Sequence, residues 1–192
     1  LLGEYIKYTV ELMIRWTRTP AIYAEAYAAN EYYFVRNETY HQSEIRSLYQ
    51  AVLDSGVDRY VQSLGRDWDE TDLWMLNSIP DWAPGFCSGA GVWGSSSATG
   101  QTILSRTLDF LVDRYGYITQ LNVIAHYHGN ATRNDVVAFT FPGMIGALSG
   151  FNQHGVWIHL DASNAPITVA PNRTQIMIAM RNFLEQENGT DI

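Results

Sequence analysis

The spacing of apolar residues predicts helices in the first part of the chain. Along residues 4–16 the apolar positions recur three or four residues apart, at Ile6, Val10, Met13 and Ile14. This spacing aligns apolar side chains on one face of an α-helix, with charged residues on the other. Residues 19–34 are rich in tyrosine and alanine and predict a second helix, whose aromatic side chains are expected to pack in a core or an interface rather than line a groove.

The helical spacing continues from Ser43 to Gly65 and is interrupted at Ser55 and Gly56. We expect two helices here, or one helix kinked at the glycine. The acidic stretch from Asp67 to Asp72 precedes an apolar run, which predicts a helix N-cap and an acidic first turn. A calcium loop would need a glycine and a terminal glutamate that this stretch lacks.

After Ser78 the pattern changes to a period of two, which predicts strands. Alternation is clear in residues 121–128 and 137–141, and residues 155–160 predict one more short strand. Upstream, the residues Ala98 to Gln101 suggest the turn of a hairpin between residues 89–94 and 102–106. Helical spacing returns over residues 171–187, with Ile176, Met177, Met180, Phe183 and Leu184 on one side. Helices, then antiparallel strands, then a helix predict an α+β fold.

Composition narrows the class of protein. The chain has 192 residues, 46% of them hydrophobic, which is enough for one domain with a buried core. A net charge of -8 leaves nucleic acid and anionic membranes without the basic patch they require. No apolar run is long enough for a membrane span, and no signal peptide pattern opens the chain. Because the first residue is Leu1 rather than methionine, we expect it to lie inside a longer precursor.

Cys87 is the only cysteine, so it can form neither an internal disulfide nor a thiolate metal site by itself. It is either a buried small side chain or a nucleophile. Glycine and small residues surround it, which leaves the thiol open to a substrate backbone. Its base could be a histidine, and the candidates are His41, His126, His128, His154 and His159. Cleavage just before Cys87 would instead supply its own α-amine as the base.

Two further groups of polar residues were considered as sites. His126 and His128 share one face of a predicted strand, as in some zinc sites, but no third ligand follows from the sequence and a solvated strand face is favoured. Arg106 and Leu108 are expected to share a strand face near Cys87, with Asp109 at the strand end. Arg106 and Asp109 form either an ordinary ion pair or a site where the guanidinium positions an anion or a carbonyl.

Five motifs in order resemble the N-terminal-nucleophile (Ntn) hydrolases of the penicillin acyltransferase type, peptidase family C45, related to acid ceramidase, N-acylethanolamine acid amidase and bile salt hydrolase. The resemblance covers residues 44–164. The matching residues are Asp72-Leu73 with Leu76-Asn77 and Asp81; Cys87-Ser88; Ser105 to Asp109; Pro142-Gly143 with Gly146; and Gly150, Asn152 and Gly155-Val156. Ser105 and Thr107 depart from the glycine and asparagine usual in the family.

The resemblance implies an αββα sandwich, with antiparallel sheets between helical layers, preceded by a mostly helical segment. Self-cleavage between Phe86 and Cys87 would separate a helical α chain, residues 1–86, from a catalytic β chain that stays associated with it. Cys87 would then be the nucleophile and its amine the base. Arg106 would line the substrate site, and Asp109 would orient the amine. A polar residue in the oxyanion or cleavage chemistry is expected at Asp161 or Asn164.

The function expected is that of an amidase or acyltransferase acting on a small N-acyl amide through a linear C–N bond, without a cofactor or metal. Relatives of this type extend further, so residues 87–192 are expected to be the first part of the catalytic unit. The alternatives are a non-catalytic binding protein with the same fold and a thiol hydrolase with a histidine base. Four Asn-x-Thr triplets, at Asn37, Asn130, Asn172 and Asn188, mildly favour a secreted or lysosome-like glycoprotein.

Overall fold

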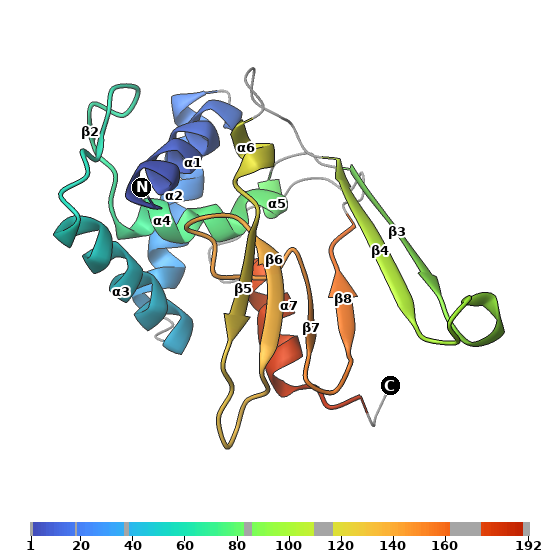
Figure 1. The fold of residues 1–192 in the computed structure, drawn as a ribbon. Helices are drawn as coiled ribbons and strands as arrows, with labels where there is room; N and C mark the ends of the chain where they lie inside the picture. The colour runs from blue at the N-terminus through green and yellow to red at the C-terminus, as the bar shows by residue number, and fades with distance from the viewer. Residues whose placement is uncertain are drawn as a thin grey trace.

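The protein is a mixed α+β structure, as the sequence predicts (Figure 1). The computed structural model describes residues 2–17, 19–36, 39–82, 86–109, 117–161 and 174–189. The helical elements are α1 (Leu2–Trp16), α2 (Pro20–Arg36), α3 (Tyr40–Asp54), α4 (Glu70–Met75), η1 (Leu76–Ser78), α5 (Ile79–Trp82), η2 (Gly94–Ser96), α6 (Tyr117–Gln120) and α7 (Ile176–Gln186). The strands are β1 (Tyr60–Val61), β2 (Arg66–Asp67), β3 (Phe86–Val92), β4 (Ile103–Asp109), β5 (Val123–Tyr127), β6 (Val136–Thr140), β7 (Ser149–Asn152) and β8 (Trp157–His159).

The two N-terminal helices form where the apolar spacing predicts them. Ile6, Val10 and Met13 of α1 have no exposed surface, which confirms the predicted buried face. In α2 the side chain of Phe34 is buried and packs on Trp74 with 5.4 Å between ring centroids. Phe34 therefore packs in the core, as predicted for the aromatic side chains of this helix. Its contact with Trp74 stabilises the packing of α2 against α4.

The prediction that helix continues after Ser55 is wrong. Helix α3 ends at Asp54, and Gly56 adopts a φ of 67°, a conformation that side chains with a Cβ disfavour. The following residues form the β1–β2 hairpin instead. Arg59 holds this segment by donating to the Tyr49 hydroxyl and the Trp68 carbonyl, both at 2.7 Å. These hydrogen bonds stabilise the hairpin over a helix, and the spacing of apolar residues does not predict them.

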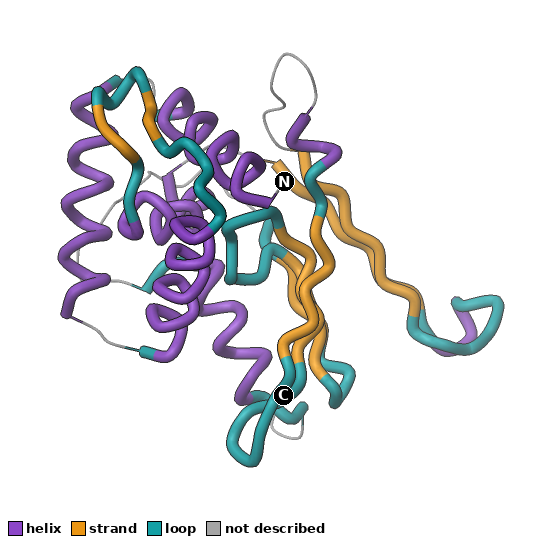
Figure 2. The backbone as a smooth tube through the Cα atoms, turned by 60° about the vertical axis from the view of Figure 1, so that its left-hand side comes forward, coloured by secondary structure: helices purple, strands orange, loops and turns teal. Residues whose placement is uncertain are grey.

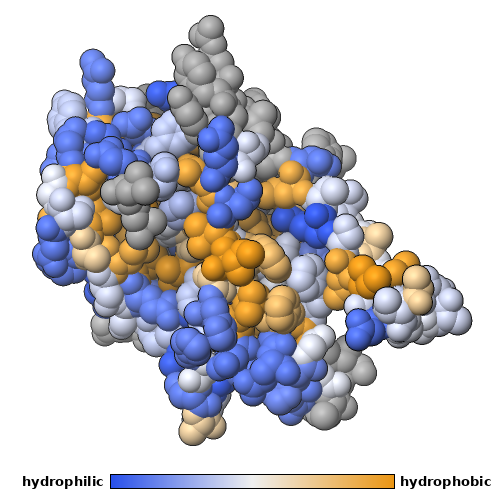
Figure 3. All heavy atoms as spheres, viewed as in Figure 1, coloured by the Kyte–Doolittle hydropathy of each residue, from blue (hydrophilic) through white to orange (hydrophobic). Residues whose placement is uncertain are grey.

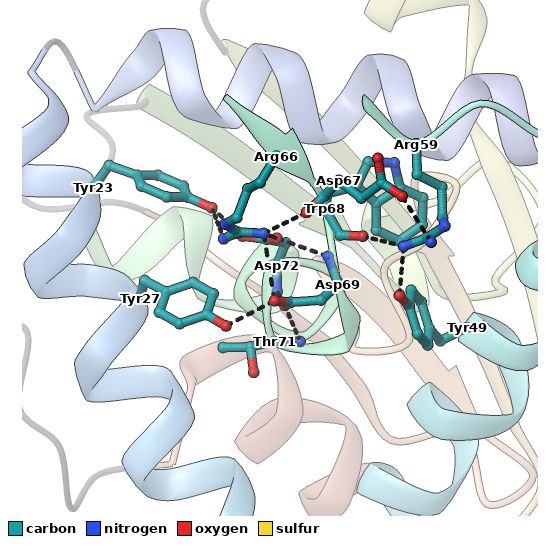
Figure 4. Close-up of polar contacts among 10 residues, drawn as sticks. All are labelled: Tyr23, Tyr27, Tyr49, Arg59, Arg66, Asp67, Trp68, Asp69, Thr71 and Asp72. Atoms are coloured by element: carbon teal, nitrogen blue, oxygen red, sulfur yellow. Dashed lines mark hydrogen bonds and ion pairs between the residues drawn. The ribbon is translucent and has the colours of Figure 1, made fainter. Parts of the chain in front are cut away.

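The acidic stretch forms the predicted helix cap. Asp69 accepts hydrogen bonds from the backbone N–H groups of Thr71 and Asp72 at the start of α4. Figure 4 shows the cluster around it, in which the fully buried Asp72 accepts two hydrogen bonds from Arg66 and one from the Tyr23 hydroxyl. The pKa of Tyr23 is raised mainly by burial and also by the charge of Asp72. Tyr23 therefore keeps its proton and donates it in the hydrogen bond to Asp72. Asp72 thus links α2, β2 and α4 as a structural residue.

Strands β5, β6, β7 and β8 form an antiparallel sheet in chain order (Figure 2). Alternate residues separate its two faces. One face packs against α7, where Val136 and Ala138 meet Leu184 in a small buried cluster. The opposite face, which we call the outer face, carries Ile124 and Phe139 with 69% and 38% of their surfaces exposed.

Strand β7 was not predicted. It has the sequence SGFN, in which the small residues give no alternation of apolar and polar side chains. Gly150 is needed here because a Cβ would lie 2.7 Å from the Val137 carbonyl oxygen. The strand is therefore specified by close backbone approach rather than by its hydrophobic pattern.

Strands β3 and β4 form a separate antiparallel hairpin among the described residues, and it projects beside β8 in Figure 1. The predicted turn between them is confirmed. The N–H of Gly100 donates to the Ser97 carbonyl at 3.1 Å, and Gly100 has a φ of 73°. The first residues of β3 and the last of β4 lie at the base of this hairpin, so its register decides how Cys87 and Arg106 face one another.

One hydrophobic core connects the N-terminal helices with the region after the hairpin. Asn77 accepts hydrogen bonds from the N–H groups of Ile145 and Gly146, each at 2.9 Å. Buried Arg181 on α7 forms an ion pair with Glu44 on α3, with separations of 2.6 and 2.8 Å. These contacts tie residues on the two sides of the Phe86–Cys87 bond into a common structure.

Helix α7 begins later than predicted and buries a somewhat different face. Its start is Ile176, and residues 171–173 lie outside the described part of the chain. Met177 and Leu184 are buried as expected, but Phe183 is 41% exposed. Ile178, Arg181 and Glu185 are buried as well. Arg181 is accommodated there because it pairs with Glu185 and with Glu44 on α3 and donates to the Ile145 carbonyl. Among the described residues, no helix has the length and apolar character to cross a membrane.

Asp81 gives the stability of the protein a predictable pH dependence. Burial raises its pKa to about 6, although the Ile176 N–H, 3.3 Å from both carboxylate oxygens, opposes that shift. Between about pH 4 and pH 6 the folded state therefore binds more protons than the unfolded state. We expect the free energy of unfolding to fall as pH rises through this range, and Asp81→Asn to flatten the fall in urea titrations. Asp54→Asn, which removes an exposed carboxylate, is the charge control; an equal flattening in both variants would contradict the assignment.

Candidate active site

The β3–β4 register brings Cys87 and Arg106 to the same face of the hairpin. Cys87 pairs with Leu108, and Gly89 pairs with Arg106, so all four residues face one side of the two strands. Arg106 and Leu108 were expected to share this face, and they do so. Glycine at position 89 leaves the backbone beside the thiol without a side chain on that face.

The Arg106 guanidinium lies directly against the thiol. Its Nη2 atom donates to Cys87 Sγ at 3.0 Å and to the Leu160 carbonyl oxygen at 2.9 Å. Its Nε atom is buried and has no hydrogen-bond partner among the described residues. A guanidinium has donors only and cannot act as a base. Arg106 can therefore stabilise negative charge on sulfur or on a nearby carbonyl oxygen, but it cannot remove the thiol proton.

Asp109 lies on the other face of the hairpin. It pairs with Phe86, while Cys87 pairs with the preceding residue of β4. The carboxylate therefore does not share a face with the thiol or with Arg106, and the two charged residues do not form the ordinary ion pair considered from the sequence. In the strand register Asp109 lies opposite Phe86, so it is next to the Phe86–Cys87 bond.

A cavity of about 310 Å³ opens between the hairpin and the outer face of the sheet. Arg106 and Leu108 line it from β4, and the opposite wall consists mainly of the apolar side chains of Val123, Ile124, Phe139, Phe141, Leu148 and Trp157. Ser149 also lines the cavity, and its hydroxyl is buried without a hydrogen-bond partner among the described residues. Figure 3 shows hydrophobic side chains gathered over this central part of the molecule and along the hairpin. The cavity thus combines an apolar wall with one fixed cation, a composition suited to an acyl group with a polar end.

His159 packs against the hairpin beside this cavity. A Cβ on Gly89 would lie 2.6 Å from His159 Nε2, which shows how closely the imidazole approaches β3. The same Nε2 lies 3.1 Å from Asp161 Oδ2, and Nδ1 accepts a hydrogen bond from the Trp157 indole at 3.2 Å. An indole N–H only donates, so Nδ1 is the acceptor and Nε2 carries the proton in the neutral ring. Both ring nitrogens are therefore engaged.

The other four histidines lie elsewhere. His126 and His128 belong to the β5–β6 hairpin, and His154 lies in the turn after β7 beside Asn134. His41 is buried in the core next to α7, where burial first, and then the charges of Arg181 and Arg133, lower its pKa to about 3. Of the five histidines, all within the described residues, His159 is the one whose ring approaches β3 at Gly89.

Of the remaining predicted site residues, Asp161 lies near the site, and the side chains of the others cannot be placed. Asp161 contacts His159 and lies next to Leu160, whose carbonyl binds Arg106. Asn164 lies outside the described residues, as does the Phe86 side chain. The sequence offers His159 only as one of five candidate bases, and it does not point to Trp157 or Ser149. His159 and Trp157 alternate along residues 157–159, which indicates a shared strand face, but no local pattern places that face against β3.

Several motif residues that carry the family resemblance have structural roles. Gly146 allows close packing on α7, because a Cβ would lie 2.6 Å from Met177 Cβ. The Asn152 side chain donates to the carbonyls of Leu184 and Glu187 and accepts from the N–H groups of His154 and Val156. These residues hold the sheet against α7 and thereby position the wall of the cavity.

Comparison of the chain with protein-family models, with curated proteins and with solved structures finds no match.

Gly89→Ala is expected to slow the self-cleavage that the family resemblance implies more than it destabilises the fold. The new methyl group must displace the His159 ring, and with it the β8 end that carries the Leu160 carbonyl. Overpacking of this kind costs about 1–3 kcal/mol, and a flexible ring keeps the loss near the lower limit. Urea unfolding and the rate of chain cleavage on denaturing gels measure the two effects. Ala90→Ser, on the exposed opposite face, is the matched control, and equal cleavage rates in both variants would contradict the expectation.

Proposed function

We propose that the protein is a cysteine Ntn hydrolase, an amidase or acyltransferase acting on linear amide bonds, matured by cleavage between Phe86 and Cys87. The observation that carries the proposal is the 3.0 Å contact between Arg106 Nη2 and Cys87 Sγ at the start of β3, beside a largely apolar cavity. A nucleophile, a fixed donor of positive charge and space for an acyl chain are the parts that acyl transfer requires.

Maturation would proceed through a thioester. The Cys87 sulfur adds to the Phe86 carbonyl carbon, the C–N bond of that peptide breaks, and the nitrogen leaves as the α-amine of Cys87. Water then attacks the thioester, which releases the Phe86 carboxylate and restores the thiol. The net reaction consumes one water molecule and no cofactor. Asp109, which pairs with Phe86 in the strand register, lies at the cleaved bond and is proposed to orient the new amine.

Turnover would use the same sulfur. The α-amine accepts the thiol proton, sulfur attacks the substrate carbonyl, and the amine then protonates the departing nitrogen. The acyl group remains on sulfur as a thioester until water or a second amine accepts it. Arg106 stabilises the negative charge that develops on sulfur or on the substrate oxygen.

The architecture proposed for the catalytic chain is the αββα sandwich. The exposed apolar side chains of the outer face, including Ile124, Phe139 and Phe151, support it because a second sheet layer would cover them. The shared core and the ion pair between buried Arg181 and Glu44 support continued association of the two chains after cleavage. Asn130 and Asn188 are exposed, as glycosylation in a secreted or lysosome-like compartment requires.

Asp161 is proposed to act in the cleavage reaction through His159. An ionised carboxylate only accepts hydrogen bonds, so it could not donate one to an oxyanion. This favours the cleavage role over the oxyanion role expected from the resemblance. Asn164 remains the proposed oxyanion donor, since its amide has two N–H donors.

A thiol hydrolase with His159 as the base is the second candidate. It is favoured by the approach of His159 to Gly89 and by the Asp161 carboxylate at 3.1 Å, which resembles the orienting contact of a catalytic triad. The hydrogen bond from Trp157 to Nδ1 argues against it, because a base needs one free nitrogen directed at the thiol. His159→Ala separates the candidates: loss of turnover with normal chain cleavage supports the histidine base.

Trapping of the acyl-enzyme tests the proposed function. The purified protein is incubated with a panel of N-acyl amides, quenched in acid and digested, and its peptides are measured by mass spectrometry. The proposal expects the mass of one acyl group on a peptide that begins with Cys87. Iodoacetamide labelling provides the control: a thiol that reacts with it but never carries an acyl group would support a non-catalytic binding protein.

A further inference from the structure

The turn between β5 and β6 brings three potential metal ligands together. His126 and His128 alternate along the strand and turn, and Asp135 returns opposite them just before β6. One ligand atom from each of these side chains lies within 4.8 Å of the other two. No third ligand for the histidine pair follows from local spacing, and hairpin formation provides it.

From this cluster we propose that His126, His128 and Asp135 bind a divalent transition-metal ion, with Zn²⁺ as the expected ion. Zinc–nitrogen and zinc–oxygen distances of about 2.0–2.2 Å in a tetrahedral site put neighbouring ligand atoms about 3.4 Å apart. His126 Nε2 and Asp135 Oδ2 are already 3.6 Å apart. The two imidazole rings have centroids 4.2 Å apart and are tilted by 51°, so small side-chain rotations suffice to direct both toward one ion.

The hairpin holds the carboxylate in place for this role. Asp135 Oδ1 accepts a 2.6 Å hydrogen bond from the Gly129 N–H, while the other oxygen faces His126. An outer hydrogen bond that orients a ligand is typical of metal sites.

The turn itself has little freedom. Asn130 and Arg133 form a bridge with backbone N–H to carbonyl distances of 2.9 and 3.4 Å. Gly129 is required at its position because a Cβ would lie 2.3 Å from the Arg133 carbonyl oxygen. A compact backbone fixes the separation of the ligands, which reduces the entropy lost when a metal ion binds.

The donor set determines the class of ion. Two imidazoles and one carboxylate suit zinc and its neighbours among the divalent transition metals, whereas calcium and magnesium prefer oxygen ligands throughout. Both imidazoles are exposed, so water can occupy the fourth position. In Figure 1 this turn lies at the opposite end of the sheet from the start of β3, so the site is separate from Cys87 and independent of the proposed amidase.

Isothermal titration with Zn²⁺, using protein without an affinity tag, tests the proposal. Cys87→Ala protein serves as the background, so that the thiol cannot contribute a ligand. One ion per chain is expected, and His126→Ala, His128→Ala and Asp135→Asn should each weaken binding at least about tenfold. His154→Ala, which removes an exposed histidine outside the cluster, should leave the affinity unchanged.

Cobalt provides a second readout on the same background. Co²⁺ bound by two imidazoles and a carboxylate should show visible d–d absorption that Zn²⁺ abolishes by displacement, and the three ligand variants should lack it. Circular dichroism of each variant confirms that its fold is retained. The proposal is overturned if Zn²⁺ binds no more tightly than Mg²⁺, or if the ligand variants and His154→Ala bind it equally.

Discussion

Replacement of Cys87 by alanine is expected to leave the chain uncut and to reduce amide turnover by about 10⁴-fold or more. The sulfur is the attacking atom in both proposed reactions, and Arg106, the side chain in contact with it, offers no lone pair that could replace it. Cys87→Ser keeps an attacking oxygen and should cleave slowly, with most turnover lost. Denaturing gels follow cleavage, and amine release follows turnover.

The control for the Cys87 variants is Ser96→Ala, which changes an exposed hydroxyl in the hairpin turn. It should cleave at the unaltered rate. Cys87→Ala protein that is cut normally, or that retains turnover, would remove the thiol from the mechanism. Urea unfolding of each variant separates lost chemistry from a lost fold.

Loss of the Arg106 guanidinium is expected to have the second largest effect. Arg106→Met should reduce turnover by about 10²–10³-fold, as expected when one preorganised donor to a developing charge is removed. Arg106→Lys should lie between Arg106→Met and the unaltered protein. An ammonium keeps the charge but lacks the planar arrangement that lets one guanidinium contact both Cys87 Sγ and the Leu160 carbonyl.

Arg15→Gln is the matched control for these variants, because it removes an exposed arginine from α1. Rates of cleavage and of turnover should both be measured, since Arg106 is proposed to act in each. Turnover in Arg106→Met equal to that in Arg15→Gln would show that the thiol contact has no catalytic role.

The sequence predicted elements whose stability is encoded locally. The face of α1 that contains Ile6, Val10 and Met13 is buried as expected, since one apolar stripe is enough to orient an amphipathic helix. The β3–β4 turn at Gly100 and the Asp69 cap of α4 were also predictable, because each depends on a residue type with a particular backbone preference.

The predictions that fail concern segments whose structure depends on contacts with residues far away in the sequence. Residues after Ser55 have helical spacing, but the hydrogen bonds of Arg59 to Tyr49 and Trp68 hold them in a hairpin. Strand β7 has no hydrophobic alternation and is specified by the approach of Gly150 to a neighbouring strand. Local patterns contain neither interaction.

In the candidate site, too, the contacts that depend on local pattern can be predicted from the sequence, and those between distant segments cannot. Arg106 lies close after Cys87 in the chain, and strand alternation with a hairpin turn brings the two to one face. His159 reaches Gly89, and the Leu160 carbonyl reaches Arg106, only through packing of β8 beside the hairpin. Asp135 joins His126 in the same way, through the β5–β6 pairing. Contacts between distant segments require the fold and do not follow from spacing.

Intact-mass spectrometry of the purified protein under denaturing conditions tests the central claim most directly. We expect two polypeptides whose masses place the break between Phe86 and Cys87. We also expect them to elute together on size exclusion before denaturation, because one core includes residues on both sides of the break. A single uncut chain whose mass and activity are the same in Cys87→Ala protein would contradict the claim.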